Sequence, residues 1–65
     1  MNFIELTLRE GIPIVVNLNN VVYIEKLDNH TFIWFNTKQS HFIEVRESFA
    51  DIQSIIEALQ RRRNK

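Results

Sequence analysis

Apolar and polar residues alternate along the first two thirds of the chain, a pattern typical of β-strands. In residues 2–9, isoleucine and leucine occupy positions 4, 6 and 8, whereas Phe3, Glu5 and Thr7 lie between them. A strand directs successive side chains to opposite faces, so each such segment has two distinct sides. The same alternation predicts five strands, over residues 2–9, 12–18, 21–27, 31–37 and 41–46.

Short turn-forming segments separate these strands. Glu10-Gly11 follows the first strand, and Gly11 is the only glycine in the chain, so we expect it at a position with positive φ. The later turns fall at Asn19-Asn20, Asp28-Asn29-His30 and Lys38-Gln39-Ser40. Connections of about four residues or fewer favour antiparallel neighbours. The sequence therefore predicts a five-stranded antiparallel meander.

After residue 46 the apolar spacing becomes that of a helix. Apolar side chains recur at positions 49, 52, 55, 56 and 59, which places them along one stripe. Ser48 is placed to cap this helix, with Asp51 as its capping-box partner. The basic residues at 61–63 suit a helix C-terminus. The predicted fold class is α+β: a five-stranded antiparallel meander and one C-terminal helix, in a single domain over residues 1–65 with a basic tail at 61–65.

Both faces of the predicted sheet are apolar, as the adjacent pairs Val15-Val16 and Val21-Val22 indicate. The face assigned to the helix holds Ile4, Leu6, Ile14, Val16, Val22, Ile24, Ile33, Phe35, Ile43 and Val45. The opposite face holds Phe3, Val15, Val21, Tyr23, Phe32, Trp34 and Phe42, with Glu5, Thr7, Glu25 and Glu44 between them.

One helix is too narrow to cover this sheet. A helix of about 14 residues is roughly 21 Å long and 10–12 Å across, and five strands at ~4.8 Å spacing make a sheet roughly 20 Å wide. The opposite face would then expose a larger apolar patch than monomers usually tolerate. Either a second copy covers it, or the sheet curls into a partly closed barrel. We favour self-association through the seven apolar residues of that face, because aromatic patches mark interfaces.

Composition and charge strengthen the case for a partner. A chain of 65 residues buries only ~60% of the surface that its unfolded form exposes, and the absence of cysteine excludes disulfides. Eight basic residues balance eight acidic ones, but Arg61, Arg62, Arg63 and Lys65 supply four of the positive charges. The remaining four basic and eight acidic residues give the body of the domain a net charge of −4.

Nucleic-acid binding is the alternative function. Exposed aromatic side chains on a sheet can stack bases of single-stranded nucleic acid, and the four basic residues at the C-terminus could contact an anionic partner. However, Glu5, Glu25 and Glu44 are predicted on the same face as the aromatics, and carboxylates repel phosphate. We therefore rank self-association first.

Catalytic and metal-binding chemistry is not predicted. His30 and His41 begin neighbouring antiparallel strands at opposite ends of a hairpin, roughly 20 Å apart, so they cannot share a metal within one chain. A single glycine excludes a glycine-rich phosphate loop. We expect no enzyme activity and no cofactor. The N-terminal residues lack a basic segment and no apolar run approaches ~18 residues, so we expect a cytoplasmic protein without a signal peptide or membrane span.

Several short motifs carry a family resemblance. In order along the chain these are "IELT" (Ile4 to Thr7), Gly11, Asn17, "VVYIE" (Val21 to Glu25) and "IEVRES" (Ile43 to Ser48). Together they resemble the small FlbD-like family of short proteins associated with bacterial flagellar operons and swarming motility. The resemblance covers roughly residues 3–60, and implies an interaction or adaptor role without catalytic residues.

Overall fold

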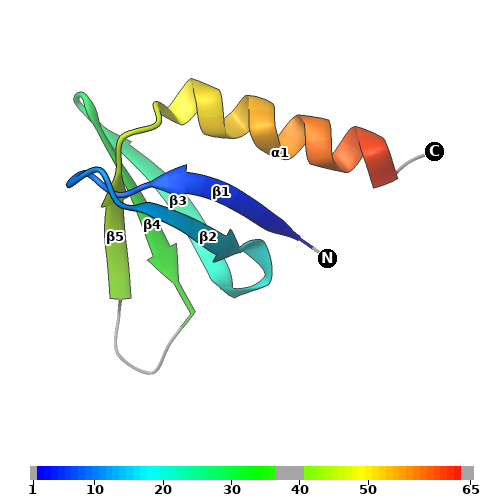
Figure 1. The fold of residues 1–65 in the computed structure, drawn as a ribbon, viewed down its shortest axis with the longest axis horizontal. Helices are drawn as coiled ribbons and strands as arrows, with labels where there is room; N and C mark the ends of the chain where they lie inside the picture. Colours follow the sequence, from blue (N-terminus) through cyan, green and yellow to red (C-terminus); the bar gives the residue numbers. More distant parts are fainter. Residues whose placement is uncertain (1, 37–40, 64–65) are drawn as a thin grey trace.

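The chain folds into two antiparallel sheets and one helix (Figure 1). The computed structural model describes residues 2–36 and 41–63, with side chains as far as Arg61. The first sheet contains β1 (Phe3–Thr7) and β2 (Pro13–Asn17), and the second contains β3 (Val21–Leu27), β4 (His30–Phe35) and β5 (His41–Val45). A 3-10 helix, η1 (Leu18–Asn20), joins the two sheets, and α1 (Phe49–Arg63) follows β5.

The α+β class and the five antiparallel strands are confirmed, but the strands do not form one meander. η1 turns the chain between β2 and β3, where the Asn17 side chain accepts a hydrogen bond from the Asn19 amide at 3.0 Å. The two sheets meet instead at the end of β1. There Leu8 forms an isolated bridge with Val45. Within the described strands, β2 and β3 remain at the free edges of their sheets, and no closed barrel is formed.

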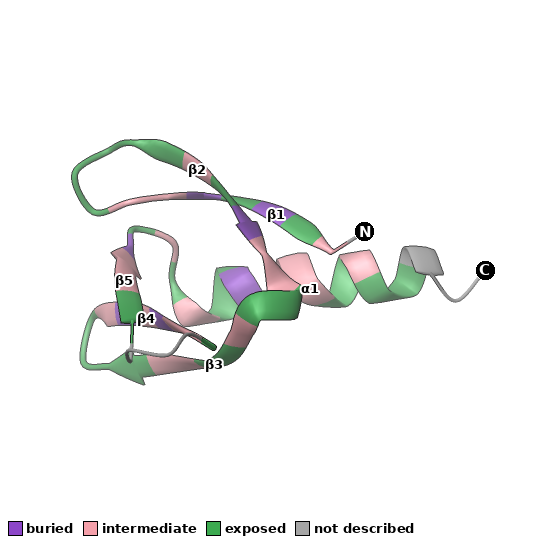
Figure 2. Ribbon diagram, turned by 90° about the horizontal axis from the view of Figure 1, so that it is seen from below, coloured by how far each residue is buried: buried purple, intermediate pink, exposed green. Residues whose placement is uncertain are grey.

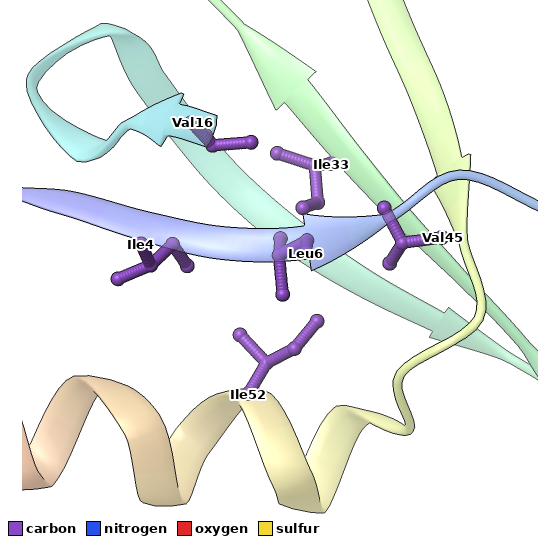
Figure 3. Close-up of a cluster of buried hydrophobic side chains, with 6 residues drawn as sticks. All are labelled: Ile4, Leu6, Val16, Ile33, Val45 and Ile52. Carbon is purple, nitrogen blue, oxygen red and sulfur yellow. The ribbon is translucent and has the colours of Figure 1, made fainter. Parts of the chain in front are cut away.

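Six apolar side chains form the core where the two sheets and the helix meet (Figure 3). They come from β1, β2, β4, β5 and α1: Ile4, Leu6, Val16, Ile33, Val45 and Ile52. The β1–β2 hairpin and the second sheet lie on opposite sides of this core, as Figure 2 shows. The predicted stripe of α1 is confirmed, since Ile55, Ile56 and Leu59 pack against the same cluster.

The predicted helix cap and turn glycine are confirmed. Ser48 Oγ accepts a hydrogen bond from the Asp51 amide at 3.1 Å, and Gly11 adopts a φ of 98°. The β3–β4 turn is shorter than predicted: His30 already belongs to β4, opposite Leu27, so that only Asp28 and Asn29 form the turn. The predicted turn over Lys38-Gln39-Ser40 lies outside the described residues.

A β-bulge near the start of β3 overturns the predicted faces of two valines. Val21 pairs with Phe35 and Tyr23 pairs with Trp34, so Val22 is an extra residue in this strand. Val21 consequently packs against the core, whereas Val22 is 59% exposed. The predictions that Val21 lies on the aromatic face and Val22 on the core face were both wrong, because the bulge shifts the alternation by one residue.

Hydrogen bonds fasten the end of β1 to the segment between β5 and α1. The Thr7 amide donates to Glu47 Oε1 at 2.9 Å, and the Arg46 amide donates to the Thr7 carbonyl at 2.8 Å. Burial alone would raise the pKa of the Glu47 carboxyl, but hydrogen bonds from the Thr7 amide and from its own amide hold this pKa below its usual value. These hydrogen bonds join the first sheet to the second, because no regular pairing of strands connects the two sheets.

Replacing Gly11 with alanine tests the turn of the β1–β2 hairpin. The φ of 98° disfavours any residue with a Cβ, and a Cβ at this position would lie 3.2 Å from Arg46 Nη2. We expect Gly11→Ala to lower the free energy of unfolding by about 1–3 kcal/mol, measured by urea denaturation. Glu10→Ala, an exposed neighbour, is the control. Equal stability of the two variants would contradict this account of the turn.

Candidate functional site

Four aromatic side chains in mutual contact lie on the outward face of the second sheet. Tyr23 stacks on Trp34 with ring centroids 5.8 Å apart, and Trp34 lies 4.6 Å from Phe42. Phe42 meets Phe32 edge to face at 5.8 Å. These residues come from β3, β4 and β5, so the contacts cross the whole sheet. We call Tyr23, Phe32, Trp34 and Phe42 the aromatic ladder.

The strand register builds this ladder. Tyr23 lies directly opposite Trp34 on β4, and Trp34 lies directly opposite Phe42 on β5. Cross-strand aromatic pairs of this kind contribute about 0.5–1.5 kcal/mol each beyond the burial of their area. The ladder is therefore a preformed surface, in which neighbouring rings already restrict one another.

Much of the ladder face is exposed to solvent. Tyr23 is 52% exposed and Phe42 is 49% exposed, whereas Phe32 and Trp34 are half-buried. Leu27 extends the same face, because it lies two residues beyond Glu25 on β3 and is 57% exposed. The sequence analysis missed Leu27, although the alternation along β3 would have placed it there.

Two carboxylates on this face are held by hydrogen bonds. Glu25 Oε1 accepts a bond from the indole nitrogen of Trp34 at 3.2 Å. Glu44 Oε2 accepts a bond from Arg9 Nη1 at 2.8 Å and lies 2.5 Å from His30 Nδ1. The hydrogen bond with His30, together with the charge and hydrogen bond of Arg9, outweighs the effect of burial and lowers the pKa of Glu44.

The His30 ring joins this polar cluster to the ladder. It stacks on Phe32 with centroids 6.1 Å apart while its Nδ1 meets Glu44. Arg9 comes from the turn of the β1–β2 hairpin, and the Arg46 side chain donates to the Arg9 carbonyl at 2.9 Å. The cluster therefore ties the first hairpin to the edge of the ladder face. The sequence analysis treated His30 as a turn residue and did not find this role.

The structure separates the seven residues predicted for self-association into three locations. Tyr23, Phe32, Trp34 and Phe42 come together in the ladder. Phe3 and Val15 are exposed residues of the β1–β2 hairpin, which lies on the other side of the core from the second sheet (Figure 2). Val21 is partly buried and packs against the core. Because the chain breaks into two sheets at η1, one predicted face becomes two faces that point away from each other. Glu5 moves with the hairpin and leaves the ladder face.

Three of the other predicted contact residues, Arg61, Arg62 and Arg63, lie at the end of α1. Arg61 is exposed, whereas the side chains of Arg62 and Arg63, and Lys65 as a whole, lie outside the described part of the chain. In the described residues, no group of three or more histidine or acidic side chains is arranged to hold a metal ion. His41 lies opposite Phe35, at the far end of the β4–β5 pair from His30, as predicted. Over the described residues, no helix has the length and apolar character that crossing a bilayer requires.

Comparison of the chain with models of known protein families, with curated proteins and with solved structures finds no match. The resemblance to FlbD-like proteins therefore stays a prediction based on short sequence motifs.

Acidification tests the Glu44 cluster. The pKa of Glu44 in the folded chain lies below its ordinary value of 4.5, so its stabilising effect is complete above that pH. This effect is lost as the pH falls through the folded-state pKa. We expect wild-type stability to fall with pH more steeply than that of Glu44→Gln, as measured by urea denaturation between about pH 7 and pH 3.

Glu57→Gln, which alters an exposed carboxylate on α1, is the control and should retain the wild-type dependence on pH. A Glu44→Gln variant with the same pH dependence as the wild type would show that the contacts with Arg9 and His30 do not stabilise the fold.

Proposed function

We propose that the chain is a small, non-catalytic interaction protein of the cytoplasm that associates with further copies of itself, with the aromatic ladder as its contact surface. The observation that carries this proposal is the ladder itself: four touching aromatic side chains on an outward sheet face. Tyrosine, tryptophan and phenylalanine are enriched in interfaces, where they dominate the binding energy.

Preorganisation makes this face well suited to binding. Each ladder ring contacts another ring of the ladder, and Trp34 is additionally held by its hydrogen bond to Glu25. Side chains that are already restricted lose less conformational entropy when a partner orders them. A partner would therefore gain the burial of exposed apolar area, at about 25 cal/mol per Å², with a small ordering cost.

The total surface of the chain also favours a partner. Folded monomers of 7.8 kDa expose about 4,400 Å² according to the usual scaling of surface with mass. This chain exposes 5189 Å², an excess of about 800 Å² over that scaling. One partner's share of a standard protein interface is also about 800 Å². Self-association would bring the exposed area to the range of an ordinary folded protein.

The charges around the ladder argue against the nucleic-acid alternative. Glu25 and Glu44 lie on the ladder face, and Arg9 already pairs with Glu44. A platform for single-stranded nucleic acid combines aromatic rings with basic residues that neutralise phosphates. Arg61 is at the end of α1, on a different element from the ladder. The ladder is therefore better suited to an uncharged protein surface.

The resemblance to FlbD-like proteins supports the same proposal. That resemblance implies a short chain without catalytic residues, of a family associated with bacterial flagellar operons and swarming motility. A self-associating interaction protein fits such a setting.

Two phenylalanines provide a matched test of the ladder. Phe42 is in the ladder and is 49% exposed, whereas Phe3 is on the hairpin and is 47% exposed. We expect Phe42→Ala to weaken self-association at least tenfold, corresponding to about 1.4 kcal/mol, and Phe3→Ala to weaken it far less. Sedimentation equilibrium over a range of concentrations measures both. Equal effects of the two substitutions would reject the ladder as the contact surface.

Binding of single-stranded DNA or RNA is expected to be absent at moderate salt. Carboxylates beside the ladder oppose the approach of phosphates, and this opposition does not depend on base sequence. Gel retardation of short single strands of DNA or RNA measures this binding. Retardation that falls steeply as the salt concentration rises, and that is lost in Trp34→Ala, would favour the nucleic-acid function instead.

A further inference from the structure

A groove of about 430 Å³ lies between α1 and β3. Its helix side is one face of α1, contributed by Phe49, Ile52, Gln53, Ile56, Leu59 and Gln60, and its strand side is the first half of β3, over residues 21–24. Leu18 and Asn2 complete it. Among the residues whose side chains the structure describes, no charged side chain lines the groove, so a charged occupant would lose its hydration without an opposite charge from these residues in return. The groove suits an uncharged, mainly apolar segment.

The groove opens beside a free sheet edge. In Figure 1 the strands of the second sheet run from left to right as β5, β4 and β3, and α1 continues to the right past β3. Figure 2 shares the same horizontal axis and shows the same overhang of the helix. An additional strand placed beside β3 would therefore lie next to the C-terminal half of α1.

The two free edges of the fold differ in how they are protected. β2 has five residues and begins with Pro13, which has no amide hydrogen to donate to a neighbouring strand. β3 has seven residues and contains no proline. It also carries Val22, Tyr23 and Leu27, three of the seven exposed large apolar residues of the described chain. Its bulge affects only its beginning, which leaves Tyr23–Leu27 regular. A free edge with a regular stretch of this length and no proline can pair with another strand.

We propose that β3 of a second copy occupies this edge, in antiparallel alignment, so that two three-stranded sheets join into one sheet of six strands. This pairing rests on the self-association put forward above, and it names the contact between two copies that forms first. The ladder face spans three strands and about six residues, or roughly 14 Å by 20 Å, which gives about 300 Å². This is less than half of the ~800 Å² that each partner contributes to a standard interface, so a second contact is needed.

The bulge and the charges of β3 together select the register of this pairing, because an axis at Tyr23 would pair the two strands across their bulges. In an antiparallel pair, residues directly opposite each other point to the same face of the sheet. If both copies keep their ladders on one side of the joined sheet, the two-fold axis therefore passes at a single β3 residue, which lies opposite its own copy. An axis at Glu25 would place two carboxylates opposite each other, which is destabilising. An axis at Ile24 instead places Ile24 opposite its own copy and Glu25 opposite Tyr23, both within the regular part of β3, with Lys26 beside the bulged Val22. Each charge then faces an uncharged side chain, and the two isoleucines meet beside the uncharged grooves.

This arrangement accounts for both the free β3 edge and the exposed ladder face of the second sheet. The two helices lie on one side of the six-stranded sheet, and the two ladders lie next to each other on the other side. Their combined area is about 600 Å², which approaches the share of a standard interface. Two such dimers can then contact each other through their ladders. Edge pairing is the first step of assembly, and contact between ladders is the second.

A single introduced cysteine tests the pairing, because the chain contains none of its own. In the proposed register, Ile24→Cys places two sulfurs on directly opposite residues, whose Cα separation of about 4.5–5.5 Å permits a disulfide. Val15→Cys, an exposed site on the other edge strand, is the control. We expect Ile24→Cys to form a covalent dimer at least tenfold faster than Val15→Cys under mild oxidation, as measured by non-reducing electrophoresis.

A second measurement guards against misfolding of the cysteine variant. Val22 and Val15 are both exposed strand valines, so lysine at either site should be tolerated by the isolated fold. In the proposed register, Val22→Lys lies beside Lys26 of the other copy, so two positive charges meet. We expect it to reduce the association constant for dimer formation at least tenfold, whereas Val15→Lys leaves this constant unchanged, as measured by sedimentation equilibrium.

The outcomes separate this inference from the proposed function. A wild-type chain that associates, together with slow cross-linking of Ile24→Cys and undisturbed association of Val22→Lys, would overturn edge pairing and leave the ladder proposal intact. A wild-type chain that remains monomeric at high micromolar concentration would overturn both. Efficient cross-linking with normal association of Phe42→Ala would retain the edge and reject the ladder.

Discussion

The shortage of buried volume is the constraint on which the rest of the structure depends. Six apolar side chains are buried in the described part of the chain, and they are shared among β1, β2, β4, β5 and α1. No sheet or helix has a core of its own, so each element is stabilised only by packing against the others. The chain consequently has enough core to cover one side of its second sheet. The outward side of that sheet keeps four touching aromatic residues in contact with solvent.

The sequence predicts the local elements well because each has a local cause. Alternation of apolar residues identifies the five strands, the single glycine marks the first turn, and Ser48 marks the start of the helix. The path of the chain at η1 has no such signal. Apolar residues alternate in the same way before and after Asn19-Asn20, so a continuous sheet and two separate sheets share one pattern. The capping of η1 by Asn17 becomes visible only in the folded chain.

The candidate surface was predictable in part for the same reason. Tyr23, Phe32, Trp34 and Phe42 follow from the alternation within β3, β4 and β5, where the strand register is regular. The placement of Val21 failed because the bulge falls between two apolar residues, which leaves no polar residue to mark the shift. The prediction that Phe3 and Val15 share a face with the ladder was wrong for a long-range reason, because their face depends on how the first hairpin is oriented. The pairing of Arg9 and His30 with Glu44 also depends on that long-range arrangement.

The central claim is that the ladder is covered when copies of the chain associate. Trp34 is the only tryptophan in the sequence and lies in the middle of the ladder, so its fluorescence reports directly on the environment of this surface. The most direct measurement is the emission maximum of the wild-type chain as its concentration rises from low to high micromolar. Our account predicts a progressive shift to shorter wavelength as water leaves the ladder. An emission maximum that does not change over this range would contradict it.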